Sequence, residues 1–147
     1  MSRITRSALV PYSAEEMYAL VADVKSYSDF LPWCGGTRVL SEDGCEVTAE
    51  VDIAFRNVRQ SFTTINQLEP GRQISMVLKE GPFSRLNGIW KFVPLDERAC
   101  KIMFDVEFEF SNRLVGAVIR PVFSMIANGM VDAFHDRARD LYGEREA

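Results

Sequence analysis

The stretch "KIMFDVEFEF" (residues 101–110) alternates apolar and polar side chains with a period of two. This alternation predicts a β-strand with one buried face and one charged face, which is typical of an antiparallel sheet covered on one side. The acidic residues of the stretch are expected on the solvated outer face, where they are not paired catalytic carboxylates. The apolar positions are Ile102, Phe104, Val106, Phe108 and Phe110.

The same period-two pattern begins upstream, at Thr37, and is interrupted by short turn signals. Because short connections favour hairpins between neighbouring strands, we expect a meander of six strands. A further strand over residues 2–10, ended by Pro11, brings the predicted sheet to about seven strands. The turn signals are "SEDG" (41–44), "RN" (56–57), "EPG" (69–71) and "PLDER" (94–98).

Two short helices are predicted between the first strand and the meander. Ser13 followed three residues later by Glu16 forms a capping box at the start of the first helix. Ser26 begins the second helix with a similar pattern, and Pro32 stops it after about one turn. The glycines of "FLPWCGG" (30–36) are then expected to let the chain turn into the first strand of the meander.

The segment 111–144 predicts a long amphipathic helix that covers the sheet. Pro121 is expected to kink this helix or split it in two. Together these elements predict one α+β domain over residues 1–147, with a curved antiparallel sheet gripping a C-terminal helix. The apolar stripe of the helix consists of Val115, Ile119, Val122, Ile126, Met130, Phe134 and Leu141.

Composition limits the class of protein. A chain of 147 residues that is 47% hydrophobic can bury a core without a disulfide or a metal. A net charge of −4 argues weakly against extended nucleic-acid binding, although local basic patches remain possible. No apolar run approaches the roughly 20 residues of a membrane span, and no clear signal-peptide cleavage site is present. We therefore expect cytoplasmic residence.

Catalytic and metal-binding patterns are absent from the sequence. It contains no nucleophile elbow, phosphate loop, dinucleotide fingerprint or zinc-protease motif. The three cysteines lack metal-ligand spacing, which predicts reduced and mostly buried thiols, and nothing near Cys34 would lower the pKa of its thiol. The single histidine, His135, falls in a polar run and is expected to face solvent. We predict a non-enzymatic protein with no metal and no cofactor.

Large apolar side chains are in excess on the expected inner face of the sheet. They form either a packed core or the wall of a hydrophobic pocket. Thr64 and Asn66 favour a pocket because they share a strand face with Phe62, and polar groups in a dry core cost a few kcal/mol each unless they are hydrogen-bonded. Two apolar loops, "FLPWCGG" (30–36) and "KEGPFSRL" (79–86), are expected to close the open end of the sheet.

Four stretches in order along the chain resemble the coenzyme Q-binding/ribosome-association toxin family of the START-like (polyketide cyclase-like) superfamily. This resemblance implies a helix-grip fold around a hydrophobic tunnel, with residues 81–83 at its mouth and residues 30–32 on the opposing lip. Eukaryotic members of that family resemble carriers of ubiquinone, and a bacterial branch binds the large ribosomal subunit and blocks subunit joining. The stretches are "ALVPYSAEEMYALVADVKSYSDFLPWC" (8–34), "FTTINQL" (62–68), "EGPFSRLNGIWKFVPL" (80–95) and "FDVEFEF" (104–110).

Three functions follow from the sequence and this resemblance. The leading hypothesis is the binding of a polyprenyl quinone such as ubiquinone in the tunnel, with transient contact between the protein and the inner membrane. The alternative is association with the large ribosomal subunit and inhibition of translation, and a lesser alternative is a polyketide cyclase-like enzyme. DNA is not expected as a partner. The predicted tunnel residues are Phe30, Leu31, Trp33, Phe62, Thr64, Asn66, Met76, Leu78, Phe83, Leu86, Trp90, Phe104, Val106, Phe108, Val122, Ile126, Met130 and Phe134.

Overall fold

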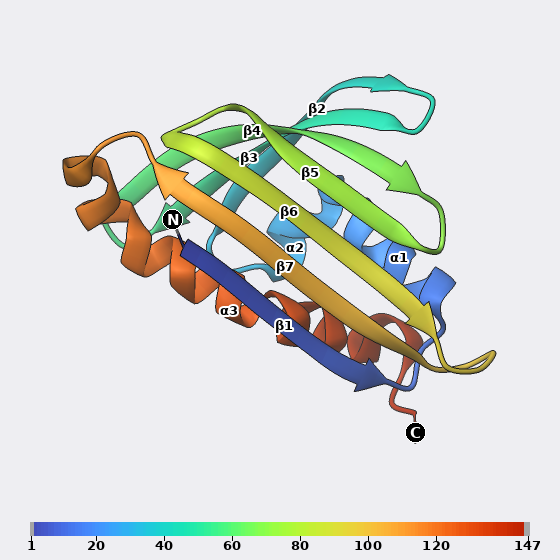
Figure 1. Ribbon diagram of the computed structural model, residues 1–147. Helices are drawn as coiled ribbons and strands as arrows, with labels where there is room; N and C mark the ends of the chain where they lie inside the picture. The colour runs from blue at the N-terminus through green and yellow to red at the C-terminus, as the bar shows by residue number, and fades with distance from the viewer. Residues whose placement is uncertain (1, 146–147) are drawn as a thin grey trace.

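Seven antiparallel strands form one curved sheet that wraps around a long helix (Figure 1). The computed structural model describes residues 2–145. The strand order is β1-β7-β6-β5-β4-β3-β2, so β2 to β7 form an unbroken meander and β1 joins it along β7. The predicted α+β class and the seven-strand sheet are confirmed. The strands are β1 (Ser2–Val10), β2 (Cys34–Asp43), β3 (Glu46–Phe55), β4 (Val58–Glu69), β5 (Gln73–Glu80), β6 (Phe83–Pro94) and β7 (Cys100–Phe110).

Short helices follow β1, as the sequence predicts, and a long helix ends the described chain. At the first helix the capping box is present: the Glu16 N–H donates to the Ser13 hydroxyl, and the Ser13 N–H donates to the Glu16 carboxylate. The second predicted capping bond is absent: Ser26 precedes the helix, but its backbone is helical (φ −92°, ψ −4°) rather than extended, so its side chain accepts no N–H of the first turn. Its hydroxyl donates to the Asp23 carboxylate at 2.6 Å. The helices are α1 (Ala14–Ala22), the 3-10 turn η1 (Val24–Ser26), α2 (Tyr27–Phe30) and α3 (Arg113–Tyr142).

The outer face of the sheet carries the predicted charges. Asp105 accepts two hydrogen bonds from the Arg3 guanidinium, at 3.0 and 2.7 Å, across the β1–β7 pair. This guanidinium holds the pKa of the Asp105 carboxyl below its usual value. Glu107 lies two residues further along the same face, 3.8 Å from Arg3. These carboxylates therefore stabilise a solvated surface.

Two segments expected to be loops belong in part to strands. β2 begins at Cys34, so Gly35 lies inside the strand, where a Cβ atom would approach the Ala54 Cβ to 2.9 Å. Residues 79–86 form a tight hairpin between β5 and β6, with Gly81 at a φ of 152°. A side chain at Gly81 would meet Phe62 at 2.8 Å. Glycine thus permits close backbone packing at both places. Of the expected covering loops, only the short turn over residues 31–33 and the two residues 81–82 remain outside a helix or strand, and Leu31 and Trp33 are buried.

α3 runs as one helix of 30 residues through Pro121, so the predicted split is wrong. Both Pro121 and Ala117, whose carbonyl lies one helical turn earlier, are exposed. Water can therefore hydrate the carbonyl that proline leaves without an N–H partner. Within residues 2–145, α3 alone contains an 18-residue window apolar enough to span a membrane by length and composition. Its buried side supplies part of this hydropathy, because 39% of the window is buried inside the protein.

Candidate functional site

An apolar cavity of about 80 Å³ lies between the inner face of the sheet and α3. Strands β3 to β7 form its wall, α3 forms its floor, and Tyr27 of α2 and Trp33 approach it from the side. The lining residues are Tyr27, Trp33, Val51, Phe62, Thr64, Met76, Leu86, Gly88, Trp90, Phe104, Val106, Phe123, Ile126, Ala127 and Met130.

The cavity is small for a ligand site. Pockets that bind small molecules usually measure about 300–1,000 Å³. Much of the interior is filled by aromatic rings instead, especially at the end where β7 meets α3. Phe123 of α3 contacts the rings of four other phenylalanines, with centroid distances of 4.8 to 6.3 Å. These four are Phe62, Phe83, Phe108 and Phe110.

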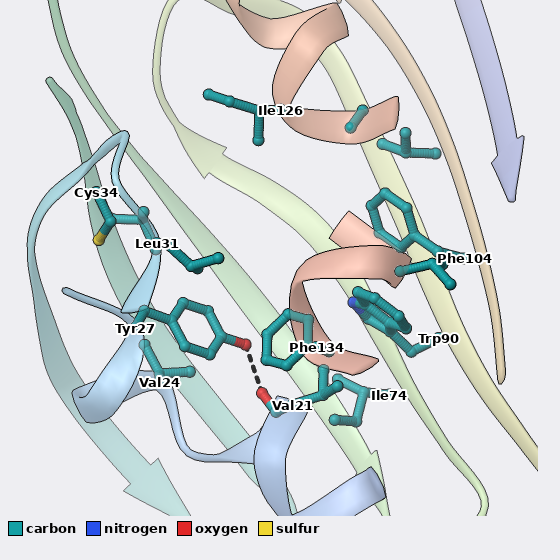
Figure 2. Close-up of a cluster of buried hydrophobic side chains, with 14 of the residues drawn as sticks. Val21, Val24, Tyr27, Leu31, Cys34, Ile74, Trp90, Phe104, Ile126 and Phe134 are labelled. Carbon is teal, nitrogen blue, oxygen red and sulfur yellow. Dashed lines mark hydrogen bonds between the residues drawn. The ribbon is translucent and has the colours of Figure 1, made fainter. Parts of the chain in front are cut away.

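The polar groups beside the cavity are mostly bonded to the protein. The Thr64 hydroxyl donates to the side-chain oxygen of Asn66 at 2.8 Å, and both residues are buried. Asn66 does not line the cavity. The Tyr27 hydroxyl donates to the Val21 carbonyl (Figure 2), and burial raises the pKa of Tyr27. Neither hydroxyl hydrogen is therefore available to a bound molecule.

Trp90 contributes a further polar group to the cavity wall. It is 1% exposed, and its ring lies 4.6 Å from Phe104 and 5.3 Å from Phe134 by centroid. No hydrogen bond joins its indole N–H to an acceptor in residues 2–145, and because no fully buried side-chain nitrogen or oxygen of these residues lacks a partner, this N–H borders open space. Figure 2 shows this ring facing the interior between β6 and α3. The cavity wall thus contains a hydrogen-bond donor without a protein partner.

The structure brings ten of the eighteen predicted tunnel residues together around the cavity. Leu31, Phe83, Phe108 and Phe134 lie in the surrounding core, while Phe30, Leu78 and Val122 are half-buried outside the lining, and Asn66 lies behind Thr64. The ten lining residues are Trp33, Phe62, Thr64, Met76, Leu86, Trp90, Phe104, Val106, Ile126 and Met130.

Five lining residues were missed by the sequence analysis. Val51 belongs to the apolar face of an alternating strand, a signal that could have identified it. Phe123 and Ala127 each follow a predicted stripe residue directly, so a broader stripe on α3 would have included them. Gly88 has no side chain that could contribute to an apolar pattern. Tyr27 lies in a single helical turn, which is too short to show a helical period.

The cysteine and histidine side chains considered as candidate reactive groups pack against the rest of the protein. The Cys34 thiol is buried and donates to the Gly36 carbonyl at 3.6 Å, and burial raises its pKa. His135 is half-buried, with its ring 6.0 Å from that of Tyr12 by centroid, so it faces solvent only in part. Within residues 2–145, no three His, Cys, Asp or Glu side chains are grouped closely enough to hold a metal ion.

Comparison with known proteins identifies relatives of the whole domain. Residues 10–135 match the family of polyketide cyclases/dehydrases and lipid transport proteins. The chain is 48% identical over 142 residues to the ribosome association toxin RatA of Pseudomonas aeruginosa, covering 97% of this chain and 99% of that one. It is 33% identical over 146 residues to the mitochondrial coenzyme Q-binding protein COQ10 homolog B of Xenopus laevis, covering 97% and 60%.

A solved structure confirms the fold at lower sequence identity. The Zhui aromatase/cyclase from Streptomyces sp. R1128 superposes with a TM-score of 0.83 at 16% identity, and the match covers 98% of this chain and 99% of that one. At this identity the likeness establishes the helix-grip architecture alone. The START-like fold predicted from the sequence is therefore confirmed.

Proposed function

Because this chain belongs to the coenzyme Q-binding/ribosome-association toxin branch of the polyketide cyclase/dehydrase and lipid transport family, we propose that it associates with the large ribosomal subunit and inhibits translation. The relative at 48% identity is named for ribosome association and is matched over nearly its whole length. This function was the alternative in the sequence analysis, and it now replaces quinone binding as the leading proposal.

The small size of the cavity supports this order. A protein that carries a polyprenyl chain needs internal space of several hundred Å³, whereas this cavity measures about 80 Å³. The aromatic cluster around Phe123 fills the end of the interior where a tunnel was expected. A protein with a filled interior acts through its outer surface, as a ribosome-binding protein must.

We propose that this function is non-enzymatic. A cyclase-like reaction needs an acid–base pair within the cavity. The fifteen residues that line it include no histidine, carboxylate, lysine, arginine or cysteine. The relatives at 48% and 33% identity are named for association and binding, and not for a reaction. We place the protein in the cytoplasm, where the ribosome is found.

Co-sedimentation with purified ribosomal subunits tests the proposal. Wild-type protein should sediment with the large subunit at low salt and dissociate as the salt concentration rises, because contacts with RNA phosphates release counterions. Ala127→Leu is the matched variant, since it adds three carbons to the cavity and leaves the outer surface unchanged. We expect this variant to bind subunits as the wild type does. Absence of wild-type protein from the large-subunit fraction at low salt removes the proposal.

A second candidate function is the binding of a hydrophobic carbonyl compound such as a polyprenyl quinone. The unpaired indole N–H of Trp90 favours it, because quinone oxygens accept hydrogen bonds and need such a donor. The apolar lining would contribute about 0.8 kcal/mol for each buried methylene group. The cavity would have to widen around the ligand. Contact between the protein and the inner membrane would give the protein access to such a ligand.

Mass spectrometry of lipids extracted from the purified protein tests this second function. A ubiquinone analogue should raise the melting temperature of the wild type, and the effect should weaken in Trp90→Phe and vanish in Ala127→Leu. The phenylalanine variant keeps an aromatic ring against Phe104 but lacks the N–H donor. If no quinone is extracted and the analogue produces no thermal shift, this function is excluded.

A further inference from the structure

The turns at the two ends of the sheet (Figure 1) expose side chains of opposite charge. Because consecutive strands are antiparallel, the turns after β2, β4 and β6 lie at one end, beside the C-terminus of α3. These three turns expose six carboxylates and two guanidinium groups, and we call them the acidic end. The carboxylates belong to Glu42, Asp43, Glu46, Glu69, Asp96 and Glu97, and the guanidinium groups to Arg72 and Arg98.

The opposite end of the sheet carries the opposite charge. It contains the turns after β3 and β5 and the loop from β7 into α3 (Figure 1). It exposes six cations and two carboxylates, Glu80 and Glu109, and α3 contains no carboxylate before Asp132. Arg85 and Glu109 also lie at this end and face each other across β6 and β7. We give the name basic end to five exposed residues: Arg56, Arg59, Lys79, Arg113 and Arg120.

Carboxylates do not neutralise the basic end. The ion pairs of the described residues involve Arg3, Arg38, Arg139 and Arg145, and none of them includes a residue of the basic end. Arg56 and Arg120 instead lie over the rings of Phe55 and Phe110, at 5.2 and 5.1 Å. An exposed guanidinium held over an aromatic ring keeps its charge available to an external anion.

Direct contacts join parts of the basic end to one another. The Ser111 N–H in the β7–α3 loop donates to the Pro82 carbonyl in the β5–β6 turn at 3.0 Å. The Phe62 ring of β4 contacts both Phe83 of β6 and Phe123 of α3. The β5–β6 turn and the β7–α3 loop are therefore joined directly, and the strand that leaves the β3–β4 turn packs through Phe62 against β6 and α3, which follow these connections. Fewer contact groups then have to be ordered when a large partner binds.

Arg56 has an unusual backbone conformation. Its φ is +53°, a left-handed value that glycine and asparagine adopt more readily, and it is the only residue other than glycine with a positive φ in residues 2–145. Asn57 follows it in the same two-residue turn. Glycine or asparagine at position 56 would satisfy this turn with less strain, so the arginine at this position is not explained by the conformation of the turn.

We propose that the basic end is the surface that contacts the phosphate backbone of ribosomal RNA, with the acidic end directed away from it. This inference rests on the proposed association with the ribosome. A protein with a net charge of −4 is repelled by RNA on average, and segregated charges overcome this repulsion in one orientation only. With about five phosphate contacts, the affinity should fall about 100- to 500-fold between 50 and 200 mM salt.

A pair of charge-matched variants tests the surface by co-sedimentation with large ribosomal subunits across a salt series. Arg56→Gln/Arg59→Gln/Arg113→Gln removes three cations from the basic end. The control, Arg72→Gln/Arg98→Gln/Lys101→Gln, makes the same change in net charge at the acidic end. We expect the first variant to lose about 100-fold in affinity at 0.1 M salt and its salt slope to fall by about two to three. The control should bind within about threefold of the wild type.

The possible outcomes separate this inference from the proposed function. If the wild type binds and the basic-end variant binds equally well, the surface is wrong and ribosome association stands. Equal weakening of both variants also overturns the surface, because net charge alone would then explain the binding. If the wild type does not bind at any salt concentration, the proposed function and this inference both fail.

A single substitution separates binding from folding. Arg56→Gly removes one cation and suits the left-handed backbone of the turn, so its melting temperature should stay within a few degrees of the wild type. Its affinity for the large subunit should nevertheless fall about fivefold at 0.1 M salt. Unchanged affinity in a folded Arg56→Gly protein contradicts a phosphate contact at this position.

Phosphatidylglycerol vesicles provide the last comparison, because Leu114 and Val118 are exposed on α3 near Arg113. RNA contact predicts that vesicles do not compete with ribosomal subunits for the protein. Vesicle binding that depends on Arg56, Arg59 and Arg113, combined with ribosome binding that does not, overturns the inference in favour of a membrane surface.

Discussion

The Thr64 hydroxyl donates its hydrogen to the side-chain oxygen of Asn66 at 2.8 Å, on one face of β4 and away from solvent. The two residues are separated by one position in the strand, so each satisfies part of the other's polarity. This bond makes it possible to bury two polar side chains in an apolar interior. It also uses the hydroxyl proton that a quinone oxygen would need.

Removal of this hydrogen bond should destabilise the fold. Thr64→Val keeps the shape of the side chain but leaves the Asn66 oxygen without its donor. We expect the free energy of unfolding to fall by about 1–3 kcal/mol, measured by urea denaturation. Thr64→Ser keeps the hydroxyl and should lose less stability. A valine variant as stable as the wild type would show that the bond contributes nothing.

The aromatic cluster predicts a large effect at Phe123. Its ring is buried and contacts four other phenylalanine rings. Phe123→Ala should therefore lower the free energy of unfolding by about 3–5 kcal/mol, through lost burial and a new cavity. Phe123→Leu should lose less than the alanine variant, because it keeps most of the apolar volume. If the two variants lose the same free energy of unfolding, the apolar volume of the side chain is not what stabilises the fold at this position.

The ion pair between Glu16 and Arg145 predicts an acid-dependent stability. Arg145 donates two hydrogen bonds to the Glu16 carboxylate, at 2.7 and 2.9 Å, and together with the Ser13 N–H it lowers the pKa of Glu16 to about 2. Since the unfolded-state pKa is higher, near 4.3, the carboxylate stabilises the fold above about pH 4.5. This contribution is lost as the pH falls toward 2.

Thermal unfolding across pH checks the Glu16 prediction. Glu16→Gln keeps an acceptor for the Ser13 N–H but removes the charge. The wild type should melt above the variant at pH 6, and the difference should shrink steadily between pH 5 and pH 2. A difference that stays constant over this range contradicts the pKa shift.

The three cysteines should differ in reactivity. Cys45 is exposed, whereas Cys34 and Cys100 are buried, and burial raises the pKa of Cys100 to about 11. Because the thiolate is the reactive form, an aromatic disulfide reagent at pH 8 should modify one thiol per native chain and three in denaturant. Cys45→Ser is the control, and its native form should show no rapid reaction.

Much of the fold could be predicted from local sequence patterns. Alternation such as that of residues 101–110 fixes which side chains face inward, because successive residues of a strand point to opposite faces. Ser13 and Glu16 lie three residues apart and form their capping box within one turn. In contrast, the second capping bond was not formed, because Ser26 also ends the preceding 3-10 turn and its helical backbone does not aim the side chain at the first N–H groups of the next helix.

The candidate site was predictable only in part. Inward-facing strand residues such as Trp90 and Phe104 were identified by alternation, and both line the cavity. Alternation cannot distinguish residues that border empty space from residues in close contact, so Phe83 and Phe108 were included although other rings surround them. Ala127 and Gly88 were missed because small side chains give little periodic signal.

The sequence by itself determined the order of the elements, the inward face of each strand, and a chain with seven strands and one long covering helix, because these depend on contacts within a few residues. Only the tertiary structure decided how much space remains inside and how the charges are distributed. The cavity volume depends on how rings from β4, β6, β7 and α3 fit together. The basic end exists because antiparallel pairing brings Arg56 and Arg113, 57 positions apart, to the same end of the sheet.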